Sequence, residues 1–178
     1  MDRSRKFLFT GPPGVGKTTA IAAISDIEPV TTEMAASDEL AERKETTTAA
    51  LDFGELHLEE GEVIRLYGTP GQRRFDFMWE LLIEGAMGLV ILIDNSREDP
   101  LADLDIYLEN FGRLIRDTGA VVGITRTEQF PAPDVDAFYA RLGAHELMLP
   151  ILECDIRQRE DVTLIMDALM STIEAQSA

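Results

Sequence analysis

Eight residues near the N-terminus have the types and the spacing of a loop that binds phosphate groups. The segment 11–18 fits the pattern G-x-x-x-x-G-K-[ST], after an apolar stretch and at the head of a helical one. Its glycines let backbone N–H groups converge on a phosphate, and the following helix adds a positive dipole. Lys17 would bridge the β- and γ-phosphates of a nucleotide, and the Thr18 hydroxyl would bind Mg²⁺. The expected contacts are Gly11, Pro13, Gly14, Val15, Gly16, Lys17, Thr18 and Thr19.

Two further segments resemble the switches of Ras-like small GTPases, in the branch that includes Arf and the bacterial MglA-type proteins. In that family a threonine before the second strand meets Mg²⁺ and the γ-phosphate, and Thr48 takes this place here. The segment Gly68-Thr69-Pro70-Gly71-Gln72 resembles D-x-x-G-Q. The resemblance implies that Gly71 contacts the γ-phosphate and that Gln72 orients the attacking water. Gly68 departs from the pattern, because the family usually has a magnesium-associated aspartate there.

The segments that would contact the base are less similar to the family. Thr125-Arg126-Thr127-Glu128 replaces the guanine-reading motif N-K-x-D after an apolar strand. The Glu128 carboxylate can accept hydrogen bonds from guanine, and Arg126 can lie along the purine. Cys154-Asp155-Ile156 takes the place of the family's S-A-K, whose backbone amide meets guanine O6. The resemblance implies GTP and GDP as ligands, contacted by Thr125, Arg126, Glu128, Cys154, Asp155 and Ile156.

Hydrolysis of GTP is expected to be slow in the isolated chain. Charge that builds on the γ-phosphate needs a cation besides Lys17, and an arginine finger is worth roughly 10³–10⁵-fold in rate. Candidate fingers are Arg43, in a long polar segment, and Arg73 and Arg74 in the second switch. The next helix, Phe75–Glu84, is apolar on two sides, which indicates either burial under loops or a partner surface. The resemblance implies a regulatory protein of the roadblock/longin type at the switches.

Two alternatives use the same phosphate loop. Asp94 ends an apolar stretch as a Walker-B aspartate does, which indicates a P-loop ATPase or kinase. The absence of an aspartate at Gly68 favours a pseudo-GTPase, a binding module that holds nucleotide without hydrolysing it. Lys17, Thr18 and Gln72 oppose that second alternative, because they retain the residues that hydrolysis needs. The main expectation is an enzyme, a small GTPase that acts as a molecular switch.

The elements that must position these residues alternate along the chain. Strands are expected at 7–10, 51–58, 63–66, 88–94, 120–124 and 149–154, and helices at 17–25, 75–84, 100–117, 133–142 and 161–173. Residues 26–47 are expected to form a long loop with a helical turn around 38–43. The alternation predicts an α/β, Ras-like P-loop NTPase fold, whose mostly parallel six-stranded sheet has one antiparallel edge strand and helices on both faces.

Composition limits the class of protein. The 178 residues are 45% hydrophobic, which predicts one globular domain over residues 1–178. A net charge of −17 disfavours nucleic acids and anionic membranes as partners. The single cysteine, Cys154, cannot form an internal disulfide. We see no signal peptide, apolar span or lipidation motif, so we expect a cytoplasmic protein without an intrinsic membrane anchor.

Overall fold

The computed structural model describes residues 4–35, 48–71 and 76–178. Within these ranges a seven-stranded sheet has the strand order β2-β3-β4-β1-β5-β6-β7. The strands are β1 (Ser4–Thr10), β2 (Val30–Ala35), β3 (Thr48–His57), β4 (Val63–Gly68), β5 (Ala86–Asp94), β6 (Ala120–Thr125) and β7 (Ile151–Cys154). Strand β3 is antiparallel to both neighbours, and the strands from β4 to β7 pair in parallel. The predicted α/β class with a mostly parallel sheet is confirmed.

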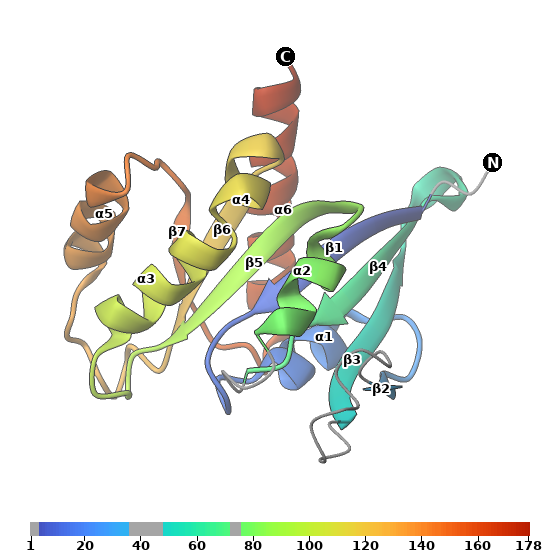
Figure 1. Cartoon of the computed structure of the whole chain (residues 1–178), viewed down its shortest axis with the longest axis horizontal. Helices are drawn as coiled ribbons and strands as arrows, with labels where there is room; N and C mark the ends of the chain where they lie inside the picture. Colours follow the sequence, from blue (N-terminus) through green and yellow to red (C-terminus); the bar gives the residue numbers. More distant parts are fainter. Residues whose placement is uncertain (1–3, 36–47, 72–75) are drawn as a thin grey trace.

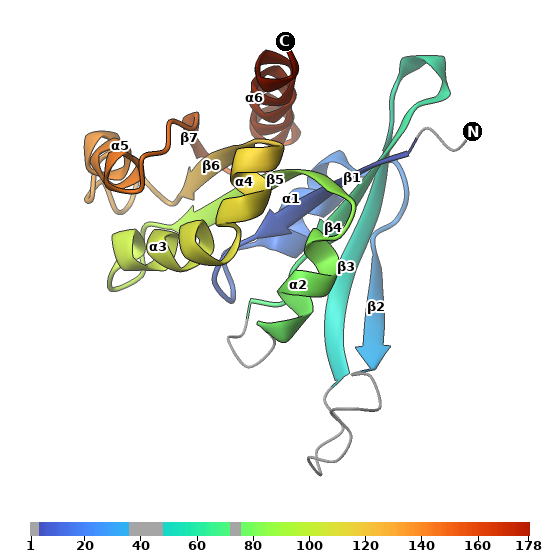
Figure 2. The same cartoon turned by 45° about the horizontal axis from the view of Figure 1, so that its top comes forward.

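Helices cover both faces of the sheet (Figures 1 and 2). They are α1 (Lys17–Ile24), α2 (Phe77–Ile83), α3 (Pro100–Asn110), α4 (Gly112–Asp117), α5 (Val135–Ala144) and α6 (Arg159–Ser177). Helices α1 and α6 share one apolar core with the sheet, and α2 to α5 share the other. Strand β5 is buried along its length except at Met87, as expected for a parallel strand covered on both faces. The two-sided arrangement that the sequence predicted is therefore present.

The helix expected at 100–117 is two helices that meet at Phe111. The first begins after Asp99, whose side chain accepts a hydrogen bond from the Ala102 amide, and Pro100 occupies its first turn. Phe111 leaves the helical conformation and is fully buried, with its ring 5.2 Å from that of Trp79. The ring of Phe111 packs in the same core as α2, as its helical spacing with other apolar residues indicated, but the sequence did not predict the break.

The polar segment 26–47 contains a strand that the sequence did not predict. Strand β2 pairs antiparallel with β3, from Val30 opposite Phe53 to Ala35 opposite Thr48. The sheet thus has one strand more than the six expected. An edge strand is held by backbone hydrogen bonds to one neighbour, so β2 lacks the apolar alternation that identifies a half-buried strand. The expected turn at 38–43 lies outside the described residues. The antiparallel strands β3 and β4 are joined through the 3-10 turn η2 (Glu59–Gly61).

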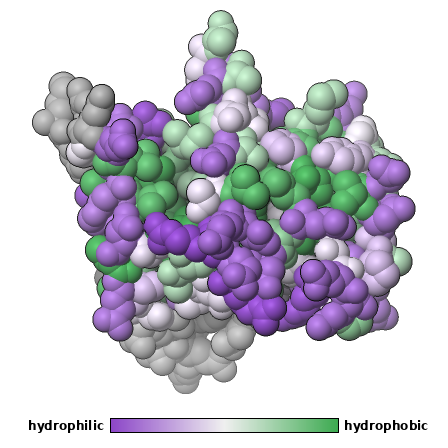
Figure 3. Space-filling model, turned by 180° about the vertical axis from the view of Figure 1, so that it is seen from behind, coloured by the Kyte–Doolittle hydropathy of each residue, from purple (hydrophilic) through white to green (hydrophobic). Residues whose placement is uncertain are grey.

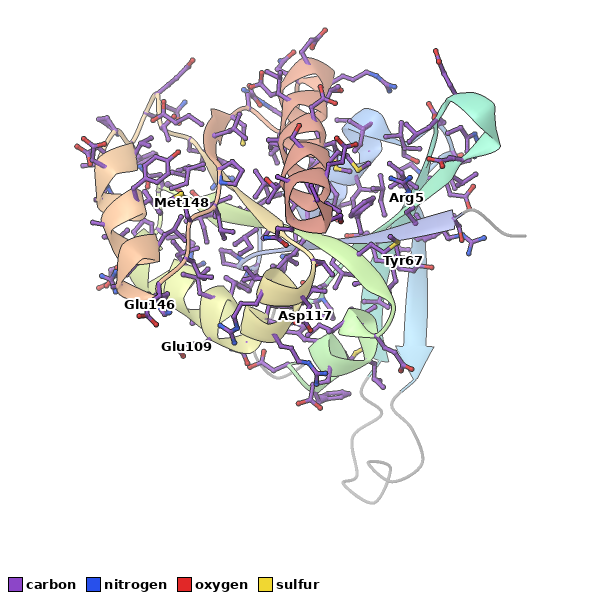
Figure 4. The ribbon with its side chains drawn as sticks, turned by 90° about the horizontal axis from the view of Figure 1, so that it is seen from above. Arg5, Tyr67, Glu109, Asp117, Glu146 and Met148 are labelled. Atoms are coloured by element: carbon purple, nitrogen blue, oxygen red, sulfur yellow. The ribbon has the colours of Figure 1, made fainter. Side chains whose placement is uncertain are left out.

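The surface is mixed in character. Figure 3 shows hydrophilic side chains over much of the rear face, with a hydrophobic band across its middle. Exposed large apolar side chains include Leu164 on α6 and Met148 in the segment before β7. In Figure 4, Met148 lies beside α5, on the opposite side of the molecule from Arg5 and Tyr67. Among the described residues, no helix combines the length and the hydrophobicity needed to cross a membrane.

Candidate functional site

The loop between β1 and α1 has a backbone that requires glycine. Gly11, Gly14 and Gly16 have φ angles of 152°, 75° and 108°, a region that other residues rarely adopt. A Cβ on Gly11 would overlap the carbonyl oxygen of Leu92, and one on Gly16 would overlap the side chain of Ile156. The loop therefore approaches β5 on one side and the segment after β7 on the other.

Lys17 places its ammonium group inside this loop. Its Nζ donates hydrogen bonds to the carbonyl oxygens of Gly11 at 2.6 Å and Pro12 at 3.1 Å. Burial lowers the pKa of Lys17 to about 8, and the nearby charge of Asp52 partly opposes this shift. The ammonium thus has neutral acceptors as partners, and an anionic phosphate oxygen would be a stronger one.

Asp52, on β3, is a site residue that the sequence did not identify. Its carboxylate accepts a hydrogen bond from the hydroxyl of Thr18 and a longer one, of 3.4 Å, from Thr31. Asp52 is also the register partner of Gly68 on β4. An acidic residue between Leu51 and Phe53 in an expected strand was the available signal, but nothing in the local pattern paired it with Thr18.

Gly71 lies against the phosphate loop. A Cβ on Gly71 would be 2.8 Å from Nζ of Lys17 and 2.8 Å from the backbone nitrogen of Pro13. The backbone at this position therefore lies beside the ammonium group expected to meet the phosphates. Of the predicted catalytic residues, Gln72, Arg73, Arg74 and Arg43 lie outside the described part of the chain.

The segment before Gly71 is fixed to neighbouring elements. The amide of Thr69 donates to the carbonyl oxygen of Phe9 at 2.8 Å, and the Thr69 hydroxyl donates to the hydroxyl of Thr10 at 2.7 Å. The indole N–H of Trp79 donates to the carbonyl oxygen of Pro70 at 3.0 Å. The segment 69–70 is thus attached to β1 on one side and to α2 on the other.

The backbone of Thr48 lies away from the cluster formed by Thr18, Lys17 and Asp52. Thr48 begins β3 and is paired with Ala35 of β2, four residues before Asp52. At about 3.3 Å per residue, this places it about 13 Å along the strand from Asp52. The metal-binding role of Thr48 stays a prediction.

Helix α2 buries most of its apolar residues. Met78, Trp79 and Leu82 are in the core, and Phe77 packs partly against it. Leu81 remains exposed. Of the two explanations for the two-sided apolar pattern, burial accounts for most of the described part of this helix.

A pocket of about 510 Å³ lies between the phosphate loop and the carboxyl ends of β6 and β7. Ligand pockets are typically roughly 300–1,000 Å³, and this strand edge is where open α/β sheets bind ligands. Its lining brings together the predicted contacts of both base-reading segments and part of the loop, namely Gly14, Val15, Gly16, Thr19, Thr125, Arg126, Glu128, Cys154, Asp155 and Ile156.

The guanidinium of Arg126 has a partner on β5. It donates to the carboxylate of Asp94 and, at 3.3 Å, to the hydroxyl of Ser96. Asp94 is buried and also accepts from the amide and the hydroxyl of Ser96. Arg126 still lines the pocket, but its charged end is turned to Asp94, so its aliphatic stem is the part available to a base.

Asn95 supports the segment that carries Glu128. The buried amide nitrogen of its side chain donates to the carbonyl oxygens of Phe130 at 2.6 Å and Pro133 at 3.1 Å. Its backbone N–H donates to the carbonyl oxygen of Thr125. No local pattern identifies Asn95 as a site residue, because the partners of its side chain lie more than thirty residues away in the sequence.

Residues at the end of β7 and just after it form hydrogen bonds and ion pairs with one another and with α6. Burial raises the pKa of Cys154 to about 12, so its thiol stays neutral. Hydrogen bonds from Arg157 lower the pKa of Asp155 to about 2. The backbone N–H of Asp155 donates to the carboxylate of Asp161 at 2.7 Å, so this amide already has an acceptor within the protein.

A family model described as a conserved hypothetical ATP binding protein matches residues 22–110. The chain belongs to this family. It is 34% identical over 92 residues to an uncharacterized protein of Methanocaldococcus jannaschii, and the match spans 52% of each chain, so about half of that relative. It is 24% identical over 182 residues to the Ras-related protein RABD2a of Arabidopsis thaliana, covering 97% of this chain and 81% of that one.

Together these findings make the chain a nucleotide-binding P-loop protein of the GTPase-like superfamily. They do not support an assignment to the bacterial MglA-type branch, which the segments at Thr48 and at 68–72 resemble. The family description names ATP, whereas the plant relative is described as Ras-related.

The residues present fit a Mg²⁺ ion bound together with nucleotide. Mg²⁺ prefers oxygen ligands and is usually held by one or two protein groups with substrate phosphates. The Thr18 hydroxyl and the Asp52 carboxylate supply such oxygens side by side. Within the described ranges, no group of three or more His, Cys, Asp or Glu side chains could hold a metal ion. A metal in this part of the protein would therefore depend on the phosphates for the rest of its ligands.

Proposed function

We propose that this chain is a small GTPase that binds GTP and GDP with Mg²⁺ and acts as a molecular switch. The observation that carries the proposal is the position of Glu128, which lines the same pocket as Gly14 and Gly16 of the phosphate loop. The edge of guanine that faces such a carboxylate presents two donors, N1–H and the exocyclic amine. Adenine presents an acceptor at N1, which a carboxylate repels.

Catalysis in this proposal is positioning and charge neutralisation rather than covalent chemistry. Lys17 neutralises the transferred phosphate, and the amide of Gly71 contacts it from beside Lys17. Gln72 orients the attacking water. When bound, Mg²⁺ would be held through Thr18 and would neutralise phosphate charge.

Turnover by the isolated protein is proposed to be slow. A further cation comes from Arg43, Arg73 or Arg74, or from a regulatory protein. The resemblance of Thr48 and of the Pro70-Gly71-Gln72 segment to the MglA-type branch supports a regulator of the roadblock/longin type, acting in the cytoplasm. The net charge of −17 supports a protein partner over nucleic acid.

A second candidate is an ATP-binding protein, favoured by the description of the family. In that case Asp94 would serve as the Walker-B carboxylate. However, Asp94 accepts hydrogen bonds from Arg126 and Ser96, and the Thr18 hydroxyl donates to Asp52 instead of Asp94. A GTPase does not require a hydrogen bond between Thr18 and Asp94, so both observed contacts are compatible with it.

Competition between nucleotides tests the proposal. A fluorescent GDP analogue is bound to the purified chain in MgCl₂ and displaced with GTP or ATP. We expect GTP to displace it at a concentration at least tenfold lower than ATP, since one good bidentate pair is worth about 1–3 kcal/mol. In Glu128→Ala this preference should largely disappear, while Glu153→Ala, which removes another carboxylate of the same pocket, should retain it. Equal or tighter displacement by ATP from the unmodified chain would establish the ATP-binding candidate instead.

A further inference from the structure

We propose that Asp52 supplies the carboxylate of the Mg²⁺ site that Gly68 cannot, so that this acidic group has moved from β4 to the neighbouring strand β3. The inference rests on the proposed function only in requiring a nucleotide with Mg²⁺, whichever base the nucleotide carries. The Asp52 carboxylate would then supply the acidic group whose absence at position 68 favours a pseudo-GTPase.

The register of β3 and β4 places Asp52 next to Gly68. Asp52 and Gly68 are directly paired across the antiparallel ladder between β3 and β4. A Cβ added to Gly68 would lie 3.2 Å from the Cβ of Asp52 and 3.3 Å from its Oδ2. A carboxylate attached at Gly68 would therefore compete for the space that the Asp52 side chain occupies. The glycine leaves this space to a side chain from the adjacent strand.

The Asp52 side chain contacts the residue of the phosphate loop that is expected to bind Mg²⁺. Its Oδ2 accepts a hydrogen bond from the hydroxyl of Thr18, the residue that the phosphate-loop motif assigns to Mg²⁺. Within the described residues, its other oxygen, Oδ1, accepts only the long hydrogen bond of 3.4 Å from Thr31. The carboxylate thus contacts the side chain of the loop that is expected to bind the metal.

Asp94 is the competing carboxylate in the described structure, and its oxygens are already used. One accepts from Ser96 and the other from Arg126, at the end of the pocket where the base is expected. Carboxylates that orient a metal or its ligands typically contribute 10–100-fold to metal affinity. We therefore assign this contribution to Asp52.

The test measures magnesium enhancement, the ratio of nucleotide affinity in MgCl₂ to nucleotide affinity in EDTA. Fluorescent analogues of GDP and ADP are both titrated, and the ratio is taken with the one that binds. Asp52→Asn keeps the size of the side chain and its ability to accept from Thr18, but it removes the charge. We expect it to lower the enhancement by roughly 10–100-fold, with the affinity in EDTA close to that of the unmodified chain.

A matched control and an exchange variant complete the design. Glu55→Gln removes a charge from the same strand, three residues away, and should leave the enhancement unchanged. Asp52→Gly combined with Gly68→Asp returns the carboxylate to β4 and should recover at least part of the enhancement. This pair also decides the question if circular dichroism shows that Asp52→Asn does not fold.

An unchanged enhancement in folded Asp52→Asn overturns the assignment, and so does a folded exchange variant with no enhancement. If ADP binds and GDP does not, the guanine proposal fails while the magnesium measurement still decides the role of Asp52. If the unmodified chain binds neither analogue, both proposals fall.

Discussion

The guanidinium of Arg126, just after β6, donates to the buried carboxylate of Asp94 at the end of β5. This ion pair joins two adjacent parallel strands at the edge of the sheet where the pocket opens. It holds the start of the segment that carries Glu128. The other end of this segment is held by Asn95, whose side chain donates to the carbonyl oxygens of Phe130 and Pro133. The segment that carries Glu128 is therefore held in place by Asp94 at the end of β5 and by Asn95, the residue that follows it.

Replacing Asp94 with asparagine should disturb the base-reading segment and leave the metal site intact. We expect Asp94→Asn to lower the free energy of unfolding by about 1–3 kcal/mol, because Arg126 loses a charged acceptor. Nucleotide affinity should fall while the magnesium enhancement stays the same. Urea unfolding and the titrations in MgCl₂ and EDTA measure the two effects. A lost enhancement would instead identify Asp94 as the Walker-B acid of an ATPase.

The pKa of Lys17, about 8 in the free protein, predicts that nucleotide affinity depends on pH. Bound phosphates raise this pKa, so nucleotide binding takes up a proton above pH 8. Affinity should therefore fall by up to roughly tenfold per pH unit as the pH rises past about 8. Lys17→Arg should lose this dependence because arginine stays protonated, and Lys17→Ala should abolish binding. A flat profile for the unmodified chain between pH values of about 7 and 9.5 would contradict this account.

Gly71 offers a separate measure of the γ-phosphate contact. A methyl group there would lie 2.8 Å from Nζ of Lys17, on the side where the γ-phosphate is expected. We expect Gly71→Ala to weaken binding of a non-hydrolysable GTP analogue by tenfold or more relative to GDP, a difference of about 1.4 kcal/mol. Gly143→Ala is a suitable control, because Gly143 lies in α5, has no left-handed φ angle and has open space where a methyl group would be. Equal losses for the two nucleotides would argue against a contact specific to the triphosphate.

Trp79, the single tryptophan of the chain, should report the state of the second switch. Its indole N–H donates to the carbonyl oxygen of Pro70, and its ring lies 5.2 Å from Phe111 and 5.5 Å from Tyr107. If the γ-phosphate draws Gly71 toward it, the Pro70 carbonyl moves relative to a ring fixed in the core. We expect exchange of GDP for a GTP analogue to change the tryptophan emission, and Gly71→Ala to reduce that change. Identical emission spectra in both states would indicate a static binding module.

The phosphate loop and most of the helices and strands were predictable from the sequence alone. The motif around Lys17 is local, because its glycines and its lysine act within one turn between a strand and a helix. Strand β5 and helix α1 were predictable for a similar reason, since burial on two faces and helical spacing leave periodic patterns. Glu128 was predicted from the family motif whose place the segment 125–128 takes, and the structure puts this residue in the pocket with the loop.

Strand β2, the break at Phe111 and the contacts of Asp52 and Arg126 were decided by tertiary structure. Each depends on a partner far along the chain, such as Thr18 for Asp52 and Asp94 for Arg126. Strand register sets these pairings, and a shift of one residue would turn Asp52 to the other face of the sheet. A local pattern records which residues are acidic or apolar. The folded backbone alone decides which of them meet, because that choice is made by contacts between segments that are distant in sequence.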